Sequence, residues 1–179
     1  TFFFIMTSKQ NVGNAGEYYI SALLSAKDFV VTVTLGRNIG YDLLVENPNG
    51  STLKISVKTA LSKKAKDFLL SNKCEKLRDP NLFYAFIRLN EFEEMPDYWI
   101  VPAEEVAEVL AYSHKKWLST PRRNGGKHND TTMRAFYVVE NQYLPKDWIK
   151  KVEKFKSNFK ILEDFNNESI LYSRKPMFT

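Results

Sequence analysis

Alternating apolar and polar residues predict a β-hairpin in the N-terminal half of the chain. In the segments 41–46 and 53–58 the odd positions are apolar and most even positions are polar. A period of two is typical of strands that bury one face. The Asn-Pro-Asn-Gly sequence at 47–50 favours a tight turn between them. The two segments are therefore expected to pair as neighbouring strands.

The rest of the pattern predicts helices and further strands around that hairpin. Apolar residues with helical spacing run over 16–27, where Asn14 is the expected N-cap, and over 103–117. Strands are predicted at 29–34, 82–89, 98–101 and 135–139. The second of these is nearly all apolar, which indicates a central strand buried on both faces. The segment 61–78 has no clear pattern, and 119–132 is expected to be an exposed loop. This order is typical of a mixed α/β fold with a central sheet.

The composition fits one domain with a sizeable core, since the chain has 179 residues and is 44% hydrophobic. We place the domain at 11–157, between an N-terminal extension at 1–10, with Met6 as a candidate start, and a C-terminal tail at 158–179. The lone Cys74 excludes an intramolecular disulfide and a cysteine-rich zinc site, and it fits a reducing cytoplasm. No apolar stretch approaches the ~20 residues of a spanning helix, so no membrane partner is expected.

The charge balance is mildly basic. Lys and Arg number 26 against 21 Asp and Glu, which gives a net charge of +5 and a pI near 9.1. This excess is compatible with a nucleic-acid partner but is too small to establish one. Two basic groups are candidates for phosphate contacts: Lys63, Lys64 and Lys66, and Arg122, Arg123 and Lys127. Such contacts give salt-dependent affinity without sequence readout. The ordinary alternative is that these side chains are simply solvated.

The candidate chemistry lies on the polar face of the hairpin. Side chains alternate across a strand, so Asp42 on the first strand shares a face with Ser56 and Lys58 on the second. A carboxylate and an ammonium are thus expected side by side on adjacent strands. This pair suits divalent-metal phosphodiester chemistry.

The arrangement of a helix with Glu17, a strand with Asp42, a turn, and the triplet Ser56-Val57-Lys58 resembles the PD-(D/E)XK nuclease superfamily. The later segment 98–106 looks like the strand and helix of small uncharacterised bacterial proteins with this core. The resemblance implies an α/β, restriction-endonuclease-like fold, with a central mixed sheet flanked by helices. It also implies an endonuclease that hydrolyses phosphodiester bonds with Mg²⁺, in DNA rather than RNA.

The resemblance also implies a role for each residue. Asp42 and the backbone carbonyl of Val57 would bind Mg²⁺, which prefers oxygen ligands and keeps several waters. One water, made more acidic by the metal, would attack the phosphorus. Lys58 would orient that water or offset charge on the phosphorane. Glu17 would hold the metal or a metal-bound water. Ser56 departs from the family pattern, which has Glu, Asp or Gln at this position. A hydroxyl is a poorer metal ligand than a carboxylate.

Each of these residues also has a purely structural interpretation. Asp42 and Lys58 would form an ordinary cross-strand ion pair. Glu17 would cap its helix together with Asn14, and Ser56 would be an inert polar residue. The alternative function is therefore a catalytically degenerate nuclease fold that serves as a nucleic-acid-binding or protein-interaction module. A third hypothesis is that the basic loop and aromatic surface bind a protein partner and no DNA.

The remaining candidates are read as structural. His128 and Asp130 hint at a second metal site, but without a third ligand we interpret this segment as a solvated loop. His114 near a helix end is also interpreted as structural. Six aromatic residues are expected to pack in the core rather than stack on bases: Phe83, Tyr84, Phe86, Trp99, Trp117 and Trp148. A homodimer is suggested only by analogy with small nucleases that cut both strands.

Overall fold

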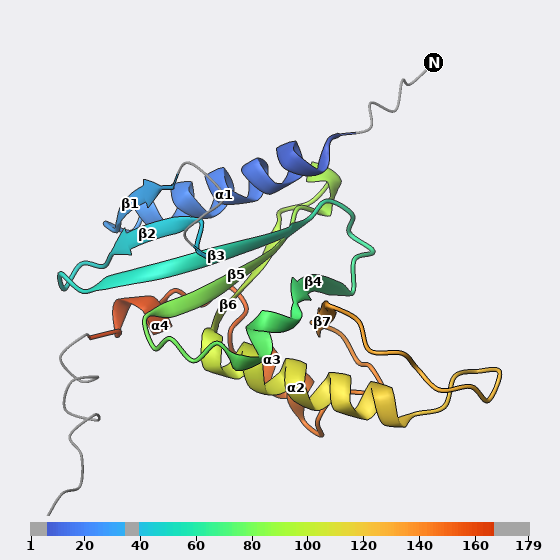
Figure 1. Ribbon diagram of the computed structural model, residues 1–179. Helices are drawn as coiled ribbons and strands as arrows, with labels where there is room; N and C mark the ends of the chain where they lie inside the picture. Colours follow the sequence, from blue (N-terminus) through green and yellow to red (C-terminus); the bar gives the residue numbers. More distant parts are fainter. Residues whose placement is uncertain (1–6, 35–39, 167–179) are drawn as a thin grey trace, which may run out of the picture.

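A five-stranded mixed sheet forms the centre of the computed structural model, which describes residues 7–34 and 40–166 (Figure 1). The strands lie in the order β1-β2-β3-β5-β6, and β3 and β5 run parallel while the other neighbours are antiparallel. Their bounds are β1 (Val30–Val33), β2 (Leu43–Glu46), β3 (Thr52–Ala60), β5 (Leu82–Arg88) and β6 (Asp97–Pro102). The predicted hairpin is thus β2 and β3. The predicted central strand is β5, which is buried over all but its last residue.

Helices cover both faces of this sheet (Figure 1). The helix α1 (Lys9–Ser25) packs on one face, over a core that includes Leu43, Ile55 and Ile100. The helix α2 (Ala103–Ser119) packs on the other face, together with a two-stranded ribbon of β4 (Asp67–Ser71) and β7 (Met133–Tyr137). The short helices are η1 (Asn72–Lys76), η2 (Asn90–Phe92), α3 (Trp148–Glu153) and α4 (Lys160–Glu163). The predicted α/β class, with a central mixed sheet flanked by helices, is confirmed.

The first helix begins earlier than predicted. It starts at Lys9, with Ser8 as its N-cap, because the Ser8 hydroxyl accepts a hydrogen bond from the Asn11 backbone. The prediction of Asn14 as N-cap is wrong: Asn14 lies inside the helix and accepts a hydrogen bond from Gln10. Gly13 interrupts the helical pattern just after this first turn, because glycine lowers helix propensity by ~1 kcal/mol. Glu17 consequently lies in the middle of α1, and the capping interpretation of Glu17 is excluded.

The segment without a clear pattern and the last predicted strand pair with each other in a separate two-stranded ribbon. Residues 61–78 contain β4 and η1, and the strand predicted at 135–139 is β7, which pairs with β4 rather than extending the central sheet. Phe68 and Phe136 lie directly across from each other on the buried face of this ribbon. Pairing over such a separation in sequence leaves no local signal.

The segment expected to be a C-terminal tail contributes to the core. Phe159 and Leu162 are buried in the same cluster as α1. The side chain of Asn47, in the turn between β2 and β3, donates hydrogen bonds of 2.8 Å to the Leu162 carbonyl and 2.9 Å to the Phe165 carbonyl. The packed part of the chain therefore continues past residue 157, up to the end of the described range. Met6 lies outside the described residues.

Candidate active site

The candidate site lies where β3 extends beyond its neighbour β2. The strand β2 pairs with β3 only over Thr52 to Ile55, whereas the pairing of β3 with β5 continues to Ala60. From Ser56 onward, no strand within the described ranges covers the β2 side of β3. Backbone N–H and C=O groups on that side need other partners, because an unpaired polar group out of contact with water is costly.

Asp42 and Lys58 supply those partners. The Val57 N–H donates to Asp42 Oδ2 at 2.6 Å, and Lys58 Nζ donates to the Val57 carbonyl at 3.0 Å. Asp42 is held in place by its own backbone, whose N–H donates to the Ile55 carbonyl at 2.9 Å. The residue just before β2 thus directs its carboxylate to the exposed peptide edge of β3.

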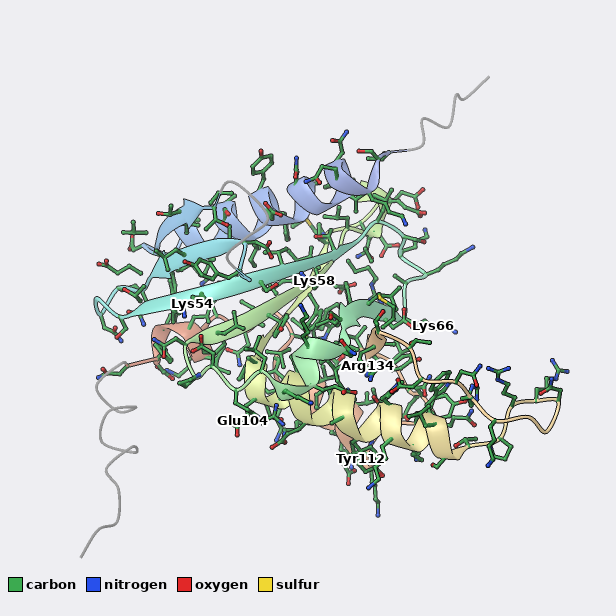
Figure 2. All side chains as sticks on the ribbon, in the orientation of Figure 1. Lys54, Lys58, Lys66, Glu104, Tyr112 and Arg134 are labelled. Carbon is green, nitrogen blue, oxygen red and sulfur yellow. The ribbon has the colours of Figure 1, made fainter. Side chains whose placement is uncertain are left out.

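Ser56 links the acid and the amine. Its hydroxyl donates to Asp42 Oδ2 at 3.2 Å and accepts from Lys58 Nζ at 3.1 Å. The direct distance from Lys58 Nζ to Asp42 Oδ2 is 4.0 Å, and about a third of each side chain is exposed, 33% and 32% respectively. The geometry therefore goes beyond the simple cross-strand ion pair of the alternative interpretation, because both charged groups also bind the Val57 backbone. Figure 2 shows Lys58 at the middle of the sheet, on β3.

Glu17 reaches the same region from α1, because the helix approaches β3 very closely. A Cβ atom placed on Gly16 would lie 2.0 Å from Thr59 Oγ1, so only glycine allows this approach. Burial raises the pKa of Glu17 above its ordinary value, the negative charge of Asp42 raises it further, and the positive charge of Lys58 opposes both. The three charged groups therefore act on one another electrostatically. Sequence reasoning gave Gly16 no role, although a glycine at the start of the predicted helix, next to Glu17, was a usable signal.

The oxygen donors at this site fit a hard divalent cation. They comprise the Asp42 and Glu17 carboxylates, the Val57 carbonyl and the Ser56 hydroxyl, all of the type that Mg²⁺ prefers. The mutual repulsion of Asp42 and Glu17 is the electrostatic condition that a cation relieves. The donor set is nevertheless poor in charge: no group of three or more His, Cys, Asp or Glu residues in the described part of the chain is arranged to hold a metal. Ser56 stands where a further carboxylate would raise that count.

The predicted phosphate-binding residues fall into two separate places. Lys63, Lys64 and Lys66 lie between the end of β3 and β4, and Lys63 is already paired with Glu93 at 2.7 Å. Figure 2 shows Lys66 beyond the end of β3. Arg122, Arg123 and Lys127 are exposed in the predicted loop, which projects beyond the C-terminal end of α2 (Figure 1). The structure thus brings together the four residues of the β-hairpin and Glu17, but not the two basic groups.

The six aromatic residues expected to pack in the core are buried, with one exception. Trp117 is half-buried rather than in the core, and its ring lies 4.0 Å from that of His128. It was misplaced because its spacing in the helix follows the apolar face, but this face runs past the end of the sheet. Asp130 binds His114 at 2.7 Å, so the hint of a metal pair between His128 and Asp130 finds no support.

Comparisons with known proteins point to the fold. No family model and no curated protein matches this chain. Among solved structures, a bacterial homing endonuclease matches with a TM-score of 0.53 and 14% identity, over 95% of this chain and 100% of that chain. At this identity the likeness shows the fold alone, and the fold is nuclease-like. In the described ranges, no helix combines the length and the apolar character needed to cross a membrane.

Proposed function

We propose that this protein is a Mg²⁺-dependent endonuclease of the PD-(D/E)XK type that hydrolyses phosphodiester bonds in DNA. The proposal is supported by the fold, which resembles that of a solved homing endonuclease over nearly the whole chain. The observation that carries it is the convergence of Asp42 and Lys58 on the backbone of Val57. An acid and an amine on one exposed peptide edge provide both a cation site and a counter-charge for phosphate.

Each side chain has a distinct task in this proposal. Asp42 and the Val57 carbonyl hold the cation, and Glu17 adds a second carboxylate from α1. When bound there, the cation would supply Lewis-acid chemistry and would make a water at the site more acidic. Lys58 places its ammonium beside the scissile phosphate, where it offsets the negative charge that develops in the transition state. Ser56 fixes the positions of Asp42 and Lys58 through its two hydrogen bonds.

A second candidate function is favoured by one observation, the neutral side chain of Ser56. With only two carboxylates, the site holds a divalent ion weakly, and the fold then serves to bind nucleic acid or a protein without cleaving it. This alternative keeps the surface charges and the fold but assigns no reaction to Lys58.

Plasmid nicking tests the proposal. We expect the wild-type protein to nick supercoiled DNA in the presence of Mg²⁺, and Asp42→Ala and Lys58→Ala to lose this activity. Lys160→Ala is the matched control, because Lys160 forms an exposed i,i+4 pair on α4, outside the site. Equal activity in all variants contradicts the proposal. Activity gained by Ser56→Glu over an inactive wild type supports the degenerate alternative, as does salt-dependent binding without cleavage.

A further inference from the structure

A hollow lies on the far side of the molecule from the α1 layer, between α2 and the β4–β7 ribbon. It is an open cavity of about 160 Å³. Its walls include the aromatic residues Trp117, Tyr137 and Tyr143 and the aliphatic residues Leu69 and Met133. These residues come from four separate segments, so the cavity is a product of the tertiary fold. Aromatic and apolar walls with a few polar groups are typical of ligand sites.

The apolar residues at the mouth of this cavity are unusually exposed. The side chains of Leu69 and Met133 are 61% and 48% exposed, respectively. Both lie on the outer face of the ribbon, because Phe68 and Phe136 take the inner face. A single exposed apolar residue is ordinary, but a pair of them beside an aromatic cavity indicates an interaction site.

The loop next to the cavity is positively charged. Arg122, Arg123 and Lys127 are exposed, and no ion pair joins them to another residue in the ranges that the structure describes. The acidic residue of this loop, Asp130, is taken up by His114 at 2.7 Å and by Arg134 at 3.4 Å. The loop therefore presents a net positive charge, which is complementary to a polyanion.

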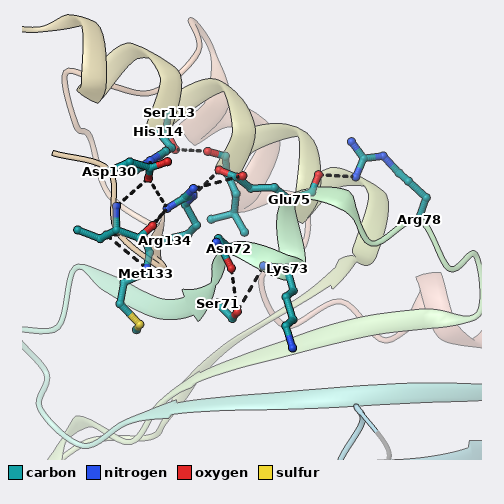
Figure 3. Close-up of polar contacts among 12 residues, drawn as sticks. Ser71, Asn72, Lys73, Glu75, Arg78, Ser113, His114, Asp130, Met133 and Arg134 are labelled. Carbon is teal, nitrogen blue, oxygen red and sulfur yellow. Dashed lines mark hydrogen bonds and ion pairs between the residues drawn. The ribbon is translucent and has the colours of Figure 1, made fainter. Parts of the chain in front are cut away.

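The base of this loop is firmly anchored. Figure 3 shows the guanidinium of Arg134 between Glu75 of η1 and Asp130. Arg134 also donates a hydrogen bond of 2.9 Å to the Met133 carbonyl, and its side chain is only 5% exposed. These contacts fix the end of the loop that leads into β7, and they include Thr131, which lies in the wall of the cavity.

We propose that this cavity binds an unpaired nucleobase, while Arg122, Arg123 and Lys127 bind the phosphates on either side of it. The base packs against the cavity walls formed by Trp117, Tyr137 and Tyr143. The Trp117 ring also contacts the rings of His128 and His114, with centroid distances of 4.0 Å and 5.3 Å. Aromatic platforms beside a cationic groove are the recurrent solution for binding single-stranded nucleic acid. This inference rests on the proposed function and deepens it, because it specifies a DNA substrate with an unpaired or displaced base.

The experiment compares two short DNA strands of equal charge, one with all its bases and one consisting of abasic sugar-phosphate. Binding to the full-length Asp42→Ala protein is measured by fluorescence anisotropy, so that cleavage does not interfere. We expect the strand with bases to bind more tightly. Trp117→Leu and Leu69→Glu should each reduce the affinity for the strand with bases about tenfold. Trp117→Leu should bind the abasic strand as tightly as the parent does.

Two further variants separate stacking from charge. Tyr112→Leu is the matched control, because Tyr112 is a 48% exposed aromatic residue on α2 that lies outside this cavity. The Tyr112→Leu protein should bind both strands as the parent does. Replacing Arg122, Arg123 and Lys127 by alanine should weaken the binding of both strands. It should also make the plot of log K against log salt less steep, by about 2 in slope.

Equal affinity for the two strands, or no effect of Trp117→Leu, overturns the inference. So does a dimer in sedimentation that Leu69→Glu dissociates, because the apolar surface then belongs to self-association. A wild-type protein that nicks plasmid but shows no preference for bases disproves this inference alone. A preference for bases without any nicking disproves the nuclease proposal alone.

Discussion

Asp42 and Lys58 are joined through the backbone of Val57 and the hydroxyl of Ser56 rather than by a close ion pair. Their charged atoms are 4.0 Å apart, whereas Asp42 lies 2.6 Å from the Val57 nitrogen and Lys58 lies 3.0 Å from the Val57 carbonyl oxygen. Each side chain therefore satisfies a peptide group that the early end of β2 leaves without a strand partner. Stability and the proposed chemistry depend on the same atoms, and variants are needed that separate the two.

Asp42→Asn and Asp42→Ala make this separation. Asparagine keeps an oxygen acceptor for the Val57 N–H, whereas alanine leaves that group without its partner at a cost of about 1–3 kcal/mol. We expect urea denaturation to show a clear loss of stability for Asp42→Ala and a smaller one for Asp42→Asn. Calorimetric titration with Mg²⁺ should show weakened binding in both. Unchanged Mg²⁺ binding by Asp42→Asn contradicts the assignment of Asp42 as a metal ligand.

Gly16 and Gly13 offer a matched pair of substitutions in one helix. A methyl group on Gly16 meets Thr59, whereas a methyl group on Gly13 meets nothing within 4 Å. Gly13→Ala should stabilise the protein by about 0.5–1 kcal/mol through helix propensity. Gly16→Ala should destabilise it by more than about 1 kcal/mol and reduce nicking, because α1 must move Glu17 away from Asp42. Thermal denaturation and the nicking assay test both, and equal behaviour of the two variants counts against close packing at Gly16.

Ser56→Glu should change metal affinity and stability in opposite directions. The side chain of Ser56 is buried at 6% exposure, so a carboxylate there is costly without a cation. A third carboxylate should strengthen Mg²⁺ binding by about tenfold, since it adds charge to a hard oxygen site. We expect a lower melting temperature without Mg²⁺ and a larger rise on its addition than in the wild type. Ser56→Gln is the neutral control and should show a smaller rise.

Asp97 should make the free energy of unfolding depend on pH in the acidic range. Burial opposes its ionisation, but hydrogen bonds from Arg88, Lys156 and Asn90 outweigh this and lower the pKa of Asp97 to about 2. The folded-state pKa lies below the unfolded value, so the stabilisation is complete above about pH 4 and is lost as the pH falls toward 2. It amounts to at most about 2 kcal/mol. Urea midpoints between pH 5 and pH 2.5 should fall less steeply for Asp97→Asn, with the exposed Asp147→Asn as control.

The sequence predicted those structural features that depend on residues close to one another in the chain. Asp42 lies just before β2 and Lys58 lies on β3, two strands joined by a short turn, and strict alternation sets which residues share a face. For this reason the polar face of the hairpin was predictable. The close approach of α1 was not, because it depends on the fit between Gly16 and Thr59, which are remote in sequence.

The elements that the sequence pattern did not predict form through contacts with residues that are distant in the chain. The strand β4 is recognisable only beside β7, since its alternation is short and lies within a lysine-rich segment. The helix α4 depends on the Asn47 side chain, which binds its last carbonyls from a turn more than a hundred residues earlier. Trp117 follows the apolar spacing of α2 but lies where the sheet no longer covers the helix.

The uncovered edge of β3 has a consequence for solubility. An exposed strand edge is a template on which other chains add strands and aggregate, and natural proteins protect such edges with charged side chains. Asp42 and Lys58 occupy the hydrogen-bonding groups of Val57 that an incoming strand needs. The same two charges that we assign to DNA cleavage therefore also keep neighbouring copies of the chain from joining through their sheets.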